Sequence, residues 1–243
     1  MPSEQPEQSE PREYFRFAFY RFADSWRALD DAARDRALDE LTSVLAAPIA
    51  PWQLCYSLVG LRADVDFAVW LKTTEGTGPL QEFEQRLRAT AAGRHLILAH
   101  NFISMTKPSP YARGASDAER EALRAYPDGA PYVFMYPMVK TRAWYALAPE
   151  ERGRIMRGHI GVGQKYPTIR INTSYSYGLD DQEFVVAFEG DDPADFLDLV
   201  SELRYTESSS YTLRDTPMFT CVLRSPRDLV AEFAATAQAA PSR

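Results

Sequence analysis

One histidine stands apart from the other residues of this chain that can do chemistry. His159 follows Ile155 and Met156 at spacings of four and three residues, so in a helix its imidazole shares their apolar face. A neutral imidazole on an apolar wall can hold the iron of a heme. The alternative is a core or helix-end histidine that is satisfied by a backbone carbonyl. The residues leave both interpretations open.

Three more side chains could serve such a site. Tyr136 and Lys140 stand at the end of a predicted strand, and the opening of that strand into a loop brings them near one face. A lysine in that place is a compact cationic anchor for a carboxylate. Glu207 could accept the second ring proton of His159, as the partner of a metal-bound histidine does. The alternatives are a half-buried tyrosine, a solvated lysine and a surface glutamate that caps a turn.

Composition and missing motifs exclude several classes of protein. The chain has 243 residues and a formal net charge of −7, whereas proteins that grip phosphate backbones are usually basic. Cys55 and Cys221 lie far apart in apolar runs, which argues against a disulfide framework and a thiolate metal site. Three unclustered histidines argue against a multi-histidine zinc site, and no G-x-S-x-G, H-E-x-x-H or Walker motif is present. Because the net charge is negative, we expect no nucleic-acid partner.

The chain ends bear on location. Residues 1–12 lack the apolar segment of a signal peptide, and no apolar stretch reaches the roughly 18 residues of a membrane span. We expect a cytoplasmic protein with no membrane partner and with disordered tails at 1–12 and 237–243.

The chain repeats itself, and the repeat indicates which elements position these side chains. Trp26 has its counterpart in Trp144, at an offset of 118 residues, and a Gly-Leu pair and a proline-led helix recur in the same order. The same offset carries His159 onto Leu41, which belongs to the apolar stripe of a predicted helix. A core position of the first half has therefore become a histidine in the second.

Each half is predicted to run strand, helix, strand, strand, helix, strand. In the first half these elements span 14–22, 25–45, 52–59, 66–71, 80–91 and 94–105. In the second they span 132–138, 149–159, 168–177, 183–188, 194–203 and 211–223. This order is that of the ferredoxin-like fold. We therefore expect an α+β protein with tandem ferredoxin-like modules at 13–106 and 131–236, joined by a linker at 107–130.

Several motifs of the second half carry a family resemblance. They are Tyr-Pro-Met-Val-Lys at 136–140, Trp-Tyr at 144–145, Pro-Glu-Glu-Arg at 149–152, Met-x-x-His at 156–159, Gly-Leu-Asp-Asp-Gln-Glu-Phe at 178–184 and Arg-Asp-Thr-Pro at 214–217. Together they resemble the chlorite dismutase family, and more closely its coproheme decarboxylase branch, the hydrogen peroxide-dependent heme synthases. The resemblance runs from about residue 14 to residue 233 and is most specific between 132 and 221. It implies modules that form an antiparallel β-barrel of the dimeric α+β barrel type, a homopentamer, and heme in the C-terminal module.

The resemblance also implies roles for single residues. It makes His159 the proximal iron ligand, Glu207 the carboxylate that hydrogen-bonds it, and Tyr136 the tyrosine that becomes a radical. Met138 and Lys140 would lie close to the porphyrin propionates. Further porphyrin contacts are expected from Trp144, Asn172 and Thr216.

Asn172 bears on the choice between activities. It stands where chlorite-degrading members carry a distal arginine, about thirteen residues after the proximal histidine, and this weakens the case for chlorite dismutation. The distal glutamine and the distal histidine of the decarboxylase groups are not found in this sequence either, so the group that handles the peroxide proton is not identified.

The resemblance thus implies an enzyme of heme biosynthesis. The expected reaction is peroxide-dependent oxidative decarboxylation of two propionates of iron-coproporphyrin III (coproheme) to give heme b. Lys140 would hold a propionate, Tyr136 would pass on the oxidising equivalent, and a transient contact with ferrochelatase is expected. The alternatives are a chlorite dismutase and a heme-binding protein without turnover.

Overall fold

The structure, a computed structural model, describes residues 12–107, 111 and 127–235. The predicted tails and most of the predicted linker lie outside the described residues. Among the described residues, no helix is both long enough and apolar enough to cross a membrane.

The described strands form one nine-stranded sheet in which every pair of strands is antiparallel. The strands are β1 (Tyr14–Phe22), β2 (Trp52–Ser57), β3 (Phe67–Thr73), β4 (Leu96–Met105), β5 (Tyr132–Lys140), β6 (Arg170–Tyr175), β7 (Phe184–Gly190), β8 (Thr212–Arg214) and β9 (Phe219–Arg224). Neighbours run β4-β1-β3-β2 in the first half and β9-β5-β7-β6 in the second, which is the same arrangement twice. The pairs β6–β4 and β2–β9 join the halves, and β7 also pairs with β5. The predicted α+β class and antiparallel sheet are confirmed.

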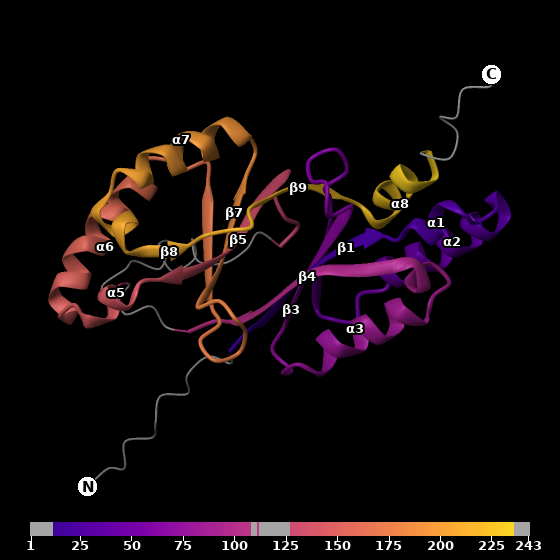
Figure 1. Cartoon of the computed structure of the whole chain (residues 1–243), viewed down its shortest axis with the longest axis horizontal. Helices are drawn as coiled ribbons and strands as arrows, with labels where there is room; N and C mark the ends of the chain where they lie inside the picture. The colour runs from indigo at the N-terminus through magenta and orange to yellow at the C-terminus, as the bar shows by residue number, and fades with distance from the viewer. Residues whose placement is uncertain (1–11, 108–110, 112–126, 236–243) are drawn as a thin grey trace, which may run out of the picture.

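The helices of the two halves lie at opposite ends of the molecule (Figure 1). The first half contributes α1 (Asp24–Arg27), α2 (Asp31–Ala46), α3 (Gly78–Ala89) and the short 3-10 helix η1 (Ala92–His95). The second contributes α5 (Arg142–Ala146), α6 (Pro149–Gly163), α7 (Pro193–Arg204) and the 3-10 helix η2 (Glu207–Tyr211). A last helix, α8 (Pro226–Ala235), returns to the first half and packs beside α2. The predicted strand–helix order is found in both halves.

Two predicted elements are divided in the structure. The helix expected over 25–45 is broken after Arg27, because Asp30 begins α2 as its N-cap and its carboxylate accepts from the Ala33 N–H at 2.7 Å. The strand expected over 211–223 is split into β8 and β9, and a cis Thr216–Pro217 bond lies between them.

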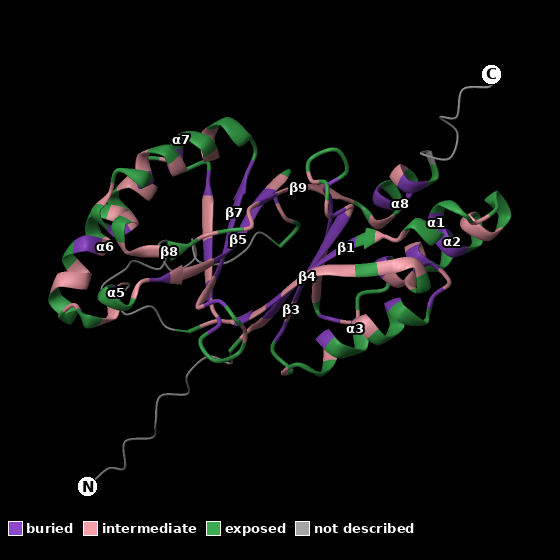
Figure 2. Cartoon of the chain, viewed as in Figure 1, coloured by how far each residue is buried: buried purple, intermediate pink, exposed green. Residues whose placement is uncertain are grey.

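Side chains of β5 alternate between two layers, as they must in a strand. Val133 and Met135 enter an apolar cluster enclosed by strands of both halves. Phe134 and Tyr136 enter a second cluster, between the sheet and α7, that also contains Phe188. The buried strands of both clusters are purple in Figure 2. Even-numbered positions of β5 therefore face the C-terminal helices.

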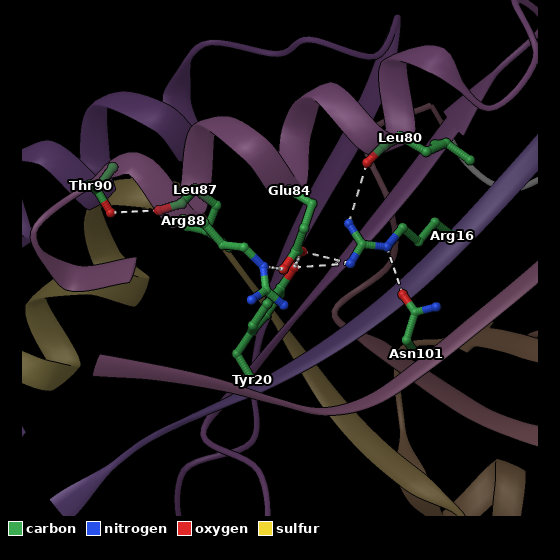
Figure 3. A network of polar contacts seen from close by, with 8 residues as sticks. All are labelled: Arg16, Tyr20, Leu80, Glu84, Leu87, Arg88, Thr90 and Asn101. Atoms are coloured by element: carbon green, nitrogen blue, oxygen red, sulfur yellow. Dashed lines mark hydrogen bonds and ion pairs between the residues drawn. The ribbon is translucent and has the colours of Figure 1, made fainter. Parts of the chain in front are cut away.

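The corresponding layer of the first half is closed by core and by an ion pair. Leu41 is fully buried in an apolar cluster that α2, α3 and α8 share. Between β1 and α3, Arg16 Nη2 lies 2.6 Å from Glu84 Oε2, and Tyr20 Oη donates to the same oxygen at 2.6 Å (Figure 3). Arg16 Nε also donates to Asn101 Oδ1 at 2.6 Å. These side chains occupy the space between the sheet and the helices of the first half. We therefore look for a ligand site in the second half.

Candidate functional site

Tyr136, Met138 and Lys140 project from the same face of β5, since they are two residues apart. Tyr136 is 9% exposed, its ring centroid lies 6.0 Å from that of Phe188, and its hydroxyl forms no hydrogen bond within the described part of the chain. Burial, and then the negative charge of Asp215, raise the pKa of Tyr136. Its phenol therefore stays protonated at neutral pH.

Lys140 is buried, so the alternative of a solvated lysine is wrong. Its Nζ donates to Ser208 O at 3.0 Å, to Ser208 Oγ at 3.1 Å and to Thr212 Oγ1 at 3.3 Å. It also lies 5.1 Å from the centroid of the Trp144 ring. Burial lowers the pKa of Lys140 to about 8. All three donors of the ammonium already have acceptors, so the predicted role as a propionate anchor needs a correction.

His159 sits on α6 with a buried Nδ1 that has no hydrogen-bond partner within the described residues. Burial, and then the positive charge of Lys140, lower the pKa of His159 to about 4. The imidazole is therefore neutral at pH 7, which is the form that binds a metal. Buried polar atoms almost always have partners, so an unpartnered ring nitrogen fits a ligand site better than a satisfied core histidine. His159 thus fits the axial ligand of an iron porphyrin.

Glu207 requires a correction, because its predicted hydrogen bond to His159 is not formed. Both carboxylate oxygens accept from Arg154 Nη2, at 2.9 and 2.7 Å, and the pair is exposed. Arg154 precedes His159 by five residues, about 140° around the helix at 3.6 residues per turn. Glu207 therefore contacts a different face of α6.

Asn172 requires a second correction. On β6 it pairs with Ala187, which belongs to the cluster enclosed by the strands, and its Nδ2 donates to Glu189 Oε2 at 2.8 Å. Tyr136 and Thr173 both pair with Val186, on the other face. Asn172 thus points away from Tyr136, and Ile171 and Thr173 take its expected place because strand side chains alternate.

The remaining predicted residues divide between two places. Trp144 is buried on α5, with its ring centroid 5.5 Å from that of Tyr211, and Met138 packs against the cluster of Tyr136. Thr216 is exposed and lines a separate pocket beside His100, Gln182 and Pro137. Pro137 faces away from Tyr136 on β5. Thr216 is therefore not brought to the His159 site.

Sequence reasoning missed the acceptors of Lys140. Ser208 and Thr212 lie about 70 residues further along the chain, in η2 and β8. No spacing pattern marks them, because the pairing of β8 with β5 places Thr212 opposite Lys140, and η2 directly precedes β8. Alternation along β6 puts Ile171 and Thr173 on the face opposite to Asn172, but only the pairing of β6 and β5 with β7 shows which of these faces is that of Tyr136.

Comparison with known proteins decides the family. Residues 34–224 match the family model described as chlorite dismutase. The chain belongs to the chlorite dismutase family. Coproheme decarboxylase of Mycolicibacterium smegmatis is 29% identical over 177 residues, which cover 73% of this chain and 75% of that protein. A putative heme-binding protein of Natronomonas pharaonis is 31% identical over 97% of this chain, and the aligned region spans 43% of that longer protein.

Solved structures agree with this membership of the chlorite dismutase family. Chlorite dismutase from Candidatus Nitrospira defluvii in complex with imidazole has a TM-score of 0.81 at 23% identity, with 91% of this chain and 95% of that chain covered. A heme-binding protein from Thermus thermophilus has a TM-score of 0.78 at 26% identity and covers 92% of this chain and 95% of its own. The first likeness shows the fold. The heme-binding relatives support a heme or porphyrin cofactor, and the predicted family is confirmed.

Proposed function

We propose that this protein decarboxylates two propionates of coproheme with hydrogen peroxide and releases heme b. The observation that carries the proposal is the placement of Lys140. It projects from the same strand face as Tyr136, and it donates to Ser208, whose hydroxyl lies 3.8 Å from Met156 Sδ on the helix of His159. One layer between β5 and the C-terminal helices therefore holds both a neutral imidazole and a buried phenol. The decarboxylase relative at 29% identity supports the same reaction.

His159 would bind the iron through its neutral imidazole. When bound, the iron porphyrin supplies the redox chemistry with peroxide. The positive charge of Lys140 opposes protonation of His159, since two like charges in one buried layer repel. We therefore assign Lys140 to the histidine and not to a propionate.

Tyr136 would carry the oxidising equivalent to the propionate. Its phenol stays protonated, so it must lose an electron and a proton together, and it can regain both by taking a hydrogen atom from the propionate β-carbon. Each propionate becomes a vinyl group by losing carbon dioxide, one proton and two electrons. One hydrogen peroxide, reduced to water, accepts these two electrons. Two peroxides are thus consumed per porphyrin.

Strand geometry weighs against chlorite dismutation. The β6 positions that share the face of Tyr136 are those of Ile171 and Thr173, and neither carries a positive charge. A heme-binding protein without turnover would need no oxidisable side chain in this layer, where Tyr136 is buried. A homopentamer and a contact with ferrochelatase remain proposals that rest on the family resemblance, and a cytoplasmic location remains a proposal as well.

A mass titration tests the reaction. The protein is loaded with iron-coproporphyrin III, peroxide is added stepwise, and the porphyrin is followed by mass. We expect two successive losses of one carbon dioxide and two hydrogens, complete near two equivalents of peroxide. An unchanged porphyrin mass, together with sustained oxygen release from chlorite, would overturn the proposal.

A further inference from the structure

Two tyrosines and a carboxylate form a hydrogen-bonded chain at the end of β5. Tyr145, on α5, donates from its hydroxyl to Glu183 Oε2 at 2.6 Å. Its oxygen lies 3.0 Å from the hydroxyl of Tyr177, in the turn after β6. Because the Tyr145 proton is given to Glu183, the Tyr177 hydroxyl donates to Tyr145. The order of the chain is therefore Tyr177, Tyr145, Glu183.

This hydrogen-bonded chain is held against β5, the strand that carries Lys140. Glu183 Oε2 also accepts from the Lys140 N–H at 2.8 Å, and the Glu183 N–H donates to Met138 O at 3.1 Å. Tyr145 directly follows Trp144, the ring beside the Lys140 ammonium. The inner end of this hydrogen-bonded chain therefore lies against β5, the strand that carries Tyr136, Met138 and Lys140. Its outer end reaches solvent, because Tyr177 is 43% exposed.

A tyrosine gives up an electron at neutral pH most readily when a nearby base takes its proton. Tyr145 has such a base, because its hydroxyl lies 2.6 Å from the Glu183 carboxylate. Burial, and then the hydrogen bond to Glu183, raise the pKa of Tyr145. Tyr145 is therefore a protonated phenol that can lose its electron and its proton in one step.

We propose that Tyr177, Tyr145 and Glu183 form a redox relay that carries oxidising equivalents from the peroxide reaction to a small phenol at the protein surface. The relay rests on the proposed function, because the peroxide reaction is the source of these oxidising equivalents. It adds a peroxidase-type activity to the decarboxylation.

Every step of the relay balances in protons and electrons. Tyr145 would give an electron to the bound porphyrin, for which hydrogen peroxide is the oxidant, and its proton to Glu183. A hydrogen atom then passes from Tyr177 to Tyr145 across their 3.0 Å contact, which restores Tyr145 and leaves the radical on Tyr177. The external phenol gives a hydrogen atom to Tyr177, and protonated Glu183 releases its proton to water.

Radical mapping tests the relay without relying on turnover. Coproheme-loaded protein is mixed with peroxide and a nitroso spin trap, and adducts are located by peptide mass. We expect an adduct on Tyr177 that is absent in Tyr177→Phe and lost from Tyr177 in Tyr145→Phe. Tyr205→Phe is the matched control, because Tyr205 is 89% exposed but belongs to no part of the chain of hydrogen bonds. An adduct on Tyr177 that persists in Tyr145→Phe, or its absence from the parent protein, would overturn the relay.

Guaiacol oxidation on the same samples gives a second measurement. Glu183→Gln keeps an oxygen for the Lys140 N–H but accepts a proton poorly, so the rate should fall by about a hundredfold, the low end of a positioned base's contribution. An unchanged rate in Glu183→Gln contradicts the relay. Porphyrin mass separates the two proposals. Decarboxylation without an adduct on Tyr177 defeats the relay alone, and an adduct formed through Tyr145 without decarboxylation defeats the proposed reaction alone.

Discussion

The positive charge of Lys140 and the burial of His159 act in the same direction, and together they lower the pKa of the histidine to about 4. Lys140 is fixed in turn by Ser208 and Thr212. An anionic partner would raise the pKa of a histidine, whereas this cationic neighbour keeps the imidazole free of a proton. The imidazole is therefore in the neutral form that can bind a metal.

Removing the imidazole should remove the porphyrin. His159→Ala is expected to abolish or badly loosen iron-porphyrin binding, measured by absorbance titration, because no other ligand is assigned to the iron. His95→Ala and His100→Ala serve as controls, since their rings bond to Ser25 and Asp64, respectively, outside this layer. Equal loss in a control variant would indicate general destabilisation and defeat the ligand assignment.

Removing the charge of Lys140 should make His159 easier to protonate. In Lys140→Met the pKa of His159 should rise from about 4, because burial remains but the repulsive charge is gone. A proton NMR titration of the ligand-free protein measures it, with Lys165→Met, an exposed lysine paired with Glu202, as the control. An unchanged His159 titration would show that Lys140 does not act on the ring.

The ligand-free protein should lose stability in acid through His159. The folded pKa of about 4 lies below the ordinary value of 6.5, so the unfolded chain binds the proton first as pH falls. Stability is complete above pH 6.5 and falls until about pH 4, by up to about 3 kcal/mol. His159→Leu, which copies the counterpart Leu41, should remove this loss. Urea unfolding at about pH 4.5 and about pH 7.5 measures the difference across that window, and equal acid losses in parent and variant would contradict it.

Glu207 should matter little to the porphyrin. Glu207→Ala breaks an exposed pair with Arg154 that contributes about 1 kcal/mol or less to the free energy of unfolding. The matched variant Arg154→Ala should behave the same way in urea unfolding and in the spectrum of the bound porphyrin. A spectral change in Glu207→Ala alone would mean that Glu207 reaches His159 after all.

The sequence predicted most of what local patterns can determine. The strand periods placed β1 and β5, and the internal repeat placed Leu41 and His159 at matched positions, one in a core and one in a site. What it could not predict depends on register and on the rotation of α6. The predicted porphyrin contact of Asn172 was wrong because a shift of one residue in the register of a strand moves a side chain to the opposite face of the sheet. Glu207 bonds to Arg154 because the turn of α6 presents the arginine to η2, and no spacing along the chain records this.

Tyr136→Phe tests most directly whether Tyr136 carries the oxidising equivalent to the propionate. The hydroxyl forms no hydrogen bond with the described residues, so its loss should change the free energy of unfolding by less than about 1 kcal/mol. The measurement is the mass of iron-coproporphyrin III after two equivalents of peroxide, with absorbance confirming that the porphyrin is bound. We expect the variant to keep the porphyrin and leave both propionates intact. If it converts both at near the parent rate, the assignment of Tyr136 is wrong.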